Sequence, residues 1–121
     1  MKLMIMTYVS DMARAVAFYE SLGLRRVTTG DPDPMWNEFA IGDATLALHG
    51  ADASTLQPPG TRPQLNLIVP PGEIERLYAR CEALGHPIGA PIQDIGFGRF
   101  FWVTDPDGLP VQINEARQAA D

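Results

Sequence analysis

The sequence predicts an α+β fold built from two βαβββ modules, and two observations lead to this fold class. An order of strand, helix and further strands occurs twice, at about residues 1–50 and 64–116, with an offset of roughly sixty residues. Each predicted helix ends just before a glycine, and a stretch rich in proline, glycine and small residues, about 51–63, separates the copies. Neither copy can bury its sheet alone, so we expect one domain over the 121 residues, with the modules packed together either within one chain or between two chains.

The first module begins with the side-chain alternation of a strand at 2–9, in which the methionines and Tyr8 share one face. Ser10-Asp11 offers an N-cap, and apolar residues at helical spacing predict a helix over 11–22 that ends at Gly23. Further strands are expected at 24–29, 35–41 and 44–49, the last two joined by a tight turn at Gly42-Asp43.

The second module repeats this order, with a strand at 64–69 and a helix that ends at Gly85. The apolar stripe of this helix is expected to comprise Ile74, Leu77, Tyr78, Cys81 and Leu84. A short strand at 86–90 and a hairpin over 99–114 follow. In the hairpin, the segment 105–108 (DPDG) has the residue types of a type I turn.

The composition excludes several classes of function. A net charge of −6 and a pI near 4.7 argue against nucleic-acid binding, which needs clustered Lys and Arg. No apolar window is long enough to span a membrane, and we recognise no secretory signal at the N-terminus. One cysteine cannot build a disulfide framework, so we expect a cytoplasmic protein.

Two segments resemble a known family. Residues 9–24 (VSDMARAVAFYESLGL) are similar to the first strand-to-helix segment of the vicinal oxygen chelate superfamily, and residues 98–108 (GRFFWVTDPDG) to its last hairpin. That superfamily holds glyoxalase I, bleomycin-resistance proteins, fosfomycin-resistance enzymes and extradiol dioxygenases. The resemblance implies that the two βαβββ modules form a curled mixed sheet with a U-shaped cleft, in a protein that is expected to be a homodimer.

Metal-dependent members of the family place four ligands in that cleft. The resemblance puts the four positions on Met4, Ala47, Gln64 and Gln112. A thioether, a methyl group and two neutral amides replace the imidazole and carboxylate donors that a divalent metal needs. We therefore predict no metal site and no cofactor.

The strand faces around these positions combine apolar, aromatic and amide side chains, which is typical of a pocket for a flat organic ligand. The predicted ligand-binding residues are Met4, Met6, Ala47, His49, Gln64, Asn66, Phe100, Trp102, Gln112 and Asn114. The alternative is that these side chains fill the cleft as ordinary core. We favour a metal-independent binding protein that sequesters a hydrophobic or aromatic small molecule, for example an antibiotic, as the bleomycin-resistance branch implies.

A second hypothesis is a glyoxalase-like enzyme, such as an isomerase, lyase, transferase or dioxygenase. Its base would be His49, expected at the rim of the cleft, or Glu38, if Glu38 rather than Asn37 faces the cleft. A metal-dependent member with a non-standard site comes third. Arg99 is expected to form a structural ion pair before any ligand contact, and Cys81 is expected to be core.

Overall fold

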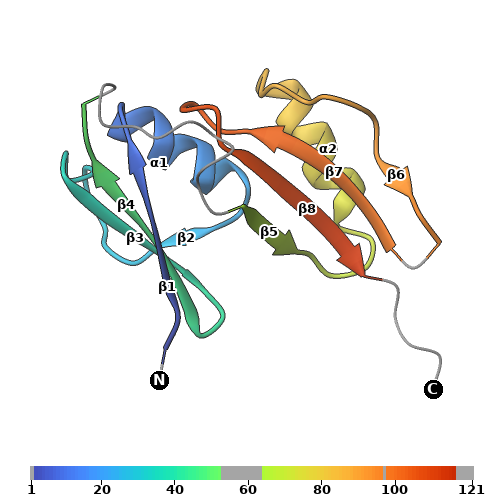
Figure 1. The fold of residues 1–121 in the computed structure, drawn as a ribbon, viewed down its shortest axis with the longest axis horizontal. Coiled ribbons are helices and arrows are strands. Elements are labelled where there is room, and N and C mark those ends of the chain that lie inside the picture. Colours follow the sequence, from blue (N-terminus) through green and yellow to red (C-terminus); the bar gives the residue numbers. More distant parts are fainter. Residues whose placement is uncertain (1, 53–63, 97, 117–121) are drawn as a thin grey trace. The chain divides into compact units, whose positions relative to one another are not determined.

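A computed structural model describes residues 2–52, 64–96 and 98–116 (Figure 1). The chain divides into two units, Met1–Arg62 and Pro63–Asp121. The first unit comprises β1 (Met4–Val9), α1 (Met12–Ser21), β2 (Arg25–Arg26), β3 (Trp36–Ile41) and β4 (Ala44–Gly50). The second comprises β5 (Leu65–Ile68), α2 (Ile74–Ala83), β6 (Gln93–Asp94), β7 (Gly98–Thr104) and β8 (Pro110–Ala116).

The two units have the same topology. Their strand orders are β1-β4-β3-β2 and β5-β8-β7-β6. In each sheet the first and last strands pair in parallel, whereas the other neighbours are antiparallel. Each unit is therefore a βαβββ module with one mixed sheet, which confirms the predicted fold class. Neither helix in the described part of the chain is long and apolar enough to cross a membrane.

Helix α1 forms where the sequence predicts it. The Asp11 side chain accepts a hydrogen bond of 3.1 Å from the Arg14 amide, which satisfies one of the unpaired N–H groups of the first turn. Beyond the helix, Gly23 adopts a φ of 95°, which a residue with a Cβ rarely does. The helix packs on the sheet through buried apolar side chains, with the Tyr19 and Phe39 rings 6.0 Å apart. This packing buries one face of the first sheet.

Helix α2 packs in the same way, and its apolar stripe is shorter than predicted. Ile74, Leu77 and Cys81 are buried, and the Tyr78 ring meets the Phe101 ring edge-on at 5.2 Å. Leu84 is 56% exposed, contrary to the prediction. It is the C-cap residue, one position beyond the last helical residue.

Arg99 links three segments of the second unit, as expected of a structural residue. Its guanidinium contacts the Glu75 carboxylate on α2 and donates to the Glu115 carboxylate on β8, with a distance of 2.7 Å between Nη2 and Oε1. Glu115 in turn accepts a bond of 2.8 Å from the Gly72 amide just before the helix. The Arg99 guanidinium holds the pKa of both carboxyl groups below their usual range.

The β7–β8 hairpin contains the predicted turn. The Gly108 amide donates to the Asp105 carbonyl at 3.0 Å, which is the bond of a type I turn. The buried Asp105 carboxylate also accepts bonds from the Asp107 and Leu109 amides at 2.9 and 2.8 Å. Asp105, the first residue of the turn, therefore stabilises the hairpin through hydrogen bonds from both its carbonyl group and its buried carboxylate.

Two strands differ from the prediction. The expected strand at 86–90 is reduced to a single bridge between Ile88 and Val103, and the edge strand β6 lies further along the chain. The Pro87 carbonyl accepts a bond of 3.0 Å from the Thr104 amide, but Pro87 has no N–H to donate in return, so the ladder is incomplete there. Strand β2 is shorter than the predicted 24–29, although the Val27 amide just beyond it still donates to the Glu38 carbonyl at 2.8 Å. Most of the predicted linker, 53–63, lies outside the described residues.

Candidate functional site

Three rings form a row across the face of the first sheet that α1 leaves open. Strand register places His49 opposite Tyr8 on one side and opposite Trp36 on the other. The Tyr8 and His49 ring centroids lie 5.1 Å apart with an interplanar angle of 57°. The His49 and Trp36 centroids lie 5.8 Å apart, nearly perpendicular at 85°. The three strands β1, β4 and β3 thus each contribute one ring to a continuous aromatic row.

The next register row carries a carboxylate. Ala47 lies between Met6 and Glu38, and Glu38 accepts a hydrogen bond of 2.9 Å from the indole nitrogen of Trp36. This bond fixes the indole and the carboxylate relative to each other on β3. Glu38 therefore faces the same side as His49, whereas Asn37 points to the helix side and is 3% exposed. The sequence had left open which of the two residues takes this position.

The open face of the first sheet presents apolar surface to solvent. Met6 is 40% exposed, Tyr8 is 42% exposed and Trp36 is 37% exposed. Ala47, in contrast, is fully buried between its neighbours. Contiguous exposed apolar side chains of this kind mark interaction surfaces more often than scattered single ones do.

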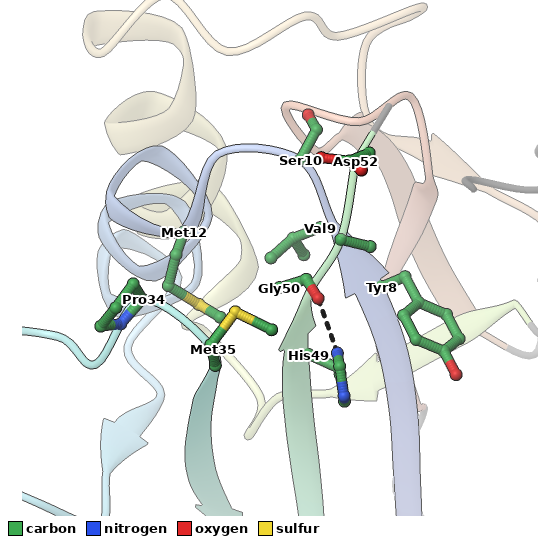
Figure 2. A pocket seen from close by; sticks show the side chains of 10 residues that line it. Tyr8, Val9, Ser10, Met12, Pro34, Met35, His49, Gly50 and Asp52 are labelled. Carbon is green, nitrogen blue, oxygen red and sulfur yellow. Dashed lines mark hydrogen bonds between the residues drawn. The ribbon is translucent and has the colours of Figure 1, made fainter. Parts of the chain in front are cut away.

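The imidazole of His49 is held in one orientation. Its Nδ1 lies 2.7 Å from the Gly50 carbonyl oxygen, as the dashed line in Figure 2 shows. A carbonyl oxygen can only accept, so Nδ1 carries the proton of this bond. In the neutral ring, Nε2 is then left with a lone pair that can accept a hydrogen bond or a proton.

A hollow of about 740 Å³ adjoins the aromatic row, where β1 and β4 end (Figure 2). Its lining combines both sulfur-bearing and ring side chains with polar ones: Tyr8, Val9, Ser10, Met12, Pro34, Met35, His49, Gly50, Ala51 and Asp52. The volume is in the range of pockets that hold drug-sized ligands, about 300–1,000 Å³. The hollow and the aromatic row share Tyr8 and His49, so a ligand seated on the rings could extend into the hollow.

The open face of the second sheet carries the predicted amides and two aromatic rings. Register aligns Asn66, Gln112 and Trp102 in one row, and Ile68, Asn114 and Phe100 in the next. The amides bond along their strands: Gln64 donates to Asn66 at 2.8 Å, and Asn114 donates to Gln112 at 3.2 Å. A smaller hollow of about 310 Å³ is lined in part by Asn66, Phe100 and Asn114. Phe101 and Val103 are buried on the helix side.

The four positions at which the family places metal ligands do not fit a metal. Within the first sheet, Met4 and Ala47 share the open face, but a methyl group donates nothing and a thioether is a soft ligand. In the second unit, Gln112 lies on the open face of β8 and Gln64 comes just before β5, and both are neutral amides. The described ranges also contain no group of three or more His, Cys, Asp or Glu side chains able to hold a metal.

The structure brings together some of the predicted site residues and adds two that were missed. Met6, Ala47, His49 and Glu38 lie in adjacent register rows of one face, and Met4 lies on that face one row further along β1. The predicted residues of the second unit gather on the open face of its own sheet. Their role in ligand binding stays a prediction.

Tyr8 and Trp36 were not predicted as site residues, although the sequence carried a signal for both. Alternation along 2–9 already put Tyr8 on the face of the methionines. A two-residue turn at 42–43 pairs Ile41 with Ala44, and counting back from that pair places Trp36 opposite His49. Only the parallel pairing of β1 with β4, which places Tyr8 beside His49, had to come from the structure.

The repeated βαβββ topology and the two open faces define a two-module α+β protein of the glyoxalase type. Residues 3–113 match the model of the Glyoxalase/Bleomycin resistance protein/Dioxygenase superfamily, and the chain belongs to that family. No curated protein matches the chain significantly.

Several solved structures share the fold. A glyoxalase/dioxygenase from Nostoc punctiforme is 23% identical, with 95% of this chain and 90% of that chain covered and a TM-score of 0.78. The fosfomycin resistance protein FosX from Mesorhizobium loti is 18% identical, with coverages of 97% and 92% and a TM-score of 0.73. A lactoylglutathione lyase from Agrobacterium tumefaciens is 23% identical, with coverages of 93% and 91% and a TM-score of 0.66. These likenesses show the fold alone.

Proposed function

We propose that this chain binds and sequesters an aromatic small molecule on the open face of its first sheet, without a metal. The observation that supports this most is the aromatic row of Tyr8, His49 and Trp36, which is partly exposed beside a hollow of about 740 Å³. Contacts on two sides hold the central ring, so the row is ordered before a ligand arrives. Preordered rings lose little conformational entropy on binding, which favours affinity.

The donor chemistry supports binding over metal-dependent catalysis. Three of the four family ligand positions carry a thioether or an amide and the fourth a methyl group, so no residue there would activate a metal-bound water or polarise a substrate oxygen in the usual way. A flat ligand needs neither. One structural neighbour, FosX, is a fosfomycin resistance protein by name. By analogy, the sequestered molecule would be an antibiotic, and binding alone would protect the cell.

Calorimetry tests the proposal. The purified protein is titrated with a panel of planar aromatic antibiotics, dyes and quinones, and Trp36→Ala is compared with Leu84→Ala. Both variants remove an exposed apolar side chain, but Leu84 is the C-cap residue of α2 in the second unit and belongs to neither sheet. We expect saturable binding. Trp36→Ala should weaken the affinity by at least roughly threefold, while Leu84→Ala should leave it unchanged. Absence of saturable binding across the panel, or equal affinity in both variants, would refute the proposal.

One observation favours a second candidate, an enzyme that uses His49 as a base. The bond from Nδ1 to the Gly50 carbonyl fixes the ring and leaves Nε2 available to take up a proton. In that case, mass spectrometry of a bound compound after incubation would show a changed product, and His49→Ala would abolish the change. A ligand recovered unaltered from the wild-type protein would support sequestration instead.

We further propose that the protein is a cytoplasmic homodimer, as the family resemblance implies. A single cysteine, buried in the core, suits a reducing compartment. Size-exclusion chromatography with light scattering should give twice the chain mass of 13.2 kDa. A mass of one chain at micromolar concentration would contradict the dimer.

A further inference from the structure

The charged side chains around the aromatic row are acidic. Glu38 lies one register row from Trp36 and His49, and it forms no ion pair with any residue that the structure describes. On the other side of the row, the hollow is lined by Asp52 and, within the described ranges, by no lysine or arginine. A ligand on the rings would therefore lie between two carboxylate-bearing residues.

The arginines of the first sheet form no ion pair with Glu38 in the part of the chain that the structure describes. Strand β2 carries two arginines, and only Arg25 shares the open face, at the edge of the sheet opposite Ala40. Arg26 points to the other side, where it donates to the Gly30 carbonyl and lies 3.5 Å from the Asn37 side-chain oxygen.

The rings themselves favour a positive charge. The π-face of an aromatic ring carries negative electrostatic potential, and a cation within about 6 Å of the ring centroid is attracted, most strongly by tryptophan. Trp36 and Tyr8 present partly exposed rings on the same face. The hydrogen bond from the Trp36 indole nitrogen holds Oε2 of Glu38, so that the second carboxylate oxygen remains able to accept from a ligand.

We propose that the ligand of this site is a planar organic cation, whose ring system lies on the Tyr8–His49–Trp36 row and whose positive charge is balanced by Glu38. This inference rests on the proposed function and names its ligand class. An anionic aromatic ligand would meet carboxylates on both sides of the row. A neutral aromatic ligand would make the ring contacts but would form no ion pair with the Glu38 carboxylate.

The test compares three probes of nearly the same shape by calorimetry: N-methylacridinium, acridine, and acridine-9-carboxylate. The buffer is mildly alkaline, in which acridine is uncharged. Each probe is titrated into the wild-type protein, Glu38→Gln and Glu20→Gln. The amide of Glu38→Gln still offers an oxygen to the Trp36 indole, so the ring keeps its place while the charge is removed. Glu20→Gln removes the same charge from an exposed position on α1.

We expect wild-type protein and Glu20→Gln to bind N-methylacridinium about tenfold more tightly than acridine, and the anion most weakly. Glu38→Gln should lower affinity for the cation about tenfold and leave the affinity for acridine unchanged. If acridine binds as tightly as the cation, or if Glu38→Gln keeps the preference for the cation, the cation inference fails while small-molecule binding stands. If none of the probes binds, both the inference and the proposed function are contradicted for this ligand class.

Discussion

Substitution of Gly50 by alanine tests whether the residues that line the hollow pack as closely as the structure shows. A Cβ at Gly50 would overlap the Pro34 carbonyl oxygen and would lie 3.3 Å from Cα and 3.4 Å from Sδ of Met35. The backbone at Gly50 and the segment around Met35 cannot easily separate, because the Gly50 amide donates to the Met35 carbonyl at 2.9 Å. Forced overpacking of this kind costs about 1–3 kcal/mol of unfolding free energy.

Gly89→Ala is the matched control. A Cβ at Gly89 meets nothing within 4 Å, and its φ is not positive. Such a change stabilises a protein by about 0.4–1 kcal/mol, because alanine restricts the unfolded chain. The same unfolded-state gain offsets part of the cost at Gly50, so we expect the two variants to differ by about 2 kcal/mol. In thermal unfolding this corresponds to midpoints roughly 8 °C apart for a protein of this size.

Urea unfolding followed by tryptophan fluorescence measures this difference, and calorimetry adds a second readout. Since Pro34 and Met35 line the hollow, their displacement in Gly50→Ala should also weaken any ligand that occupies it. If Gly50→Ala and Gly89→Ala unfold within about 0.5 kcal/mol of each other, the close packing of β4 against the segment before β3 is refuted.

Three further predictions concern the second unit. Arg99→Gln should lower the urea midpoint more than Arg76→Gln, because Arg99 joins two carboxylates whereas the Arg76 pair is longer, at 3.7 Å, and more exposed; equal midpoints would show that the contacts of Arg99 contribute nothing. Because Arg99 lowers the pKa of Glu75 and Glu115 below their ordinary value of 4.5, these pairs stabilise the fold above that pH. Wild-type stability should therefore fall as the pH drops below 4.5, and fall less steeply in Arg99→Gln, which denaturation at a series of pH values will check. Cys81 is fully buried, and burial also raises the pKa of its thiol from 9.0 to about 11, so a thiol reagent should label the native protein at least about a hundredfold more slowly than the unfolded chain; equal labelling rates would place Cys81 at the surface.

Much of the fold was predictable because its signals are local. Asp11 and Gly23 delimit α1 through their own backbone and side-chain preferences, and the turn that starts at Asp105 follows from the residue types within it. The edge strands were less predictable. Pairing of a short edge segment depends on the free groups of the neighbouring strand. The segment around Ile88 forms only one bridge to β7, whereas β6 pairs with β7 further along the chain.

The candidate site shows the same division. Which residues share a face of one strand follows from alternation, so Met4, Met6 and Tyr8 could be grouped from the sequence. Which residues stand side by side on different strands depends on register, and the row of three rings exists only across β1, β4 and β3. The orientation of the His49 ring was out of reach, because a bond to its neighbouring carbonyl sets it.

The register around Ala47 also explains why a carboxylate would be unfavourable at this position without a metal. Ala47 is fully buried, with Glu38 directly opposite on one side and Met6 on the other. A metal-binding carboxylate at this position would stand against the carboxylate of Glu38, and like charges directly opposite destabilise a sheet unless a cation lies between them. Without the metal, an alanine here removes that repulsion and leaves Glu38 as the one acidic side chain that the strands of this sheet place on the open face. The same carboxylate is then available to a ligand that brings its own positive charge.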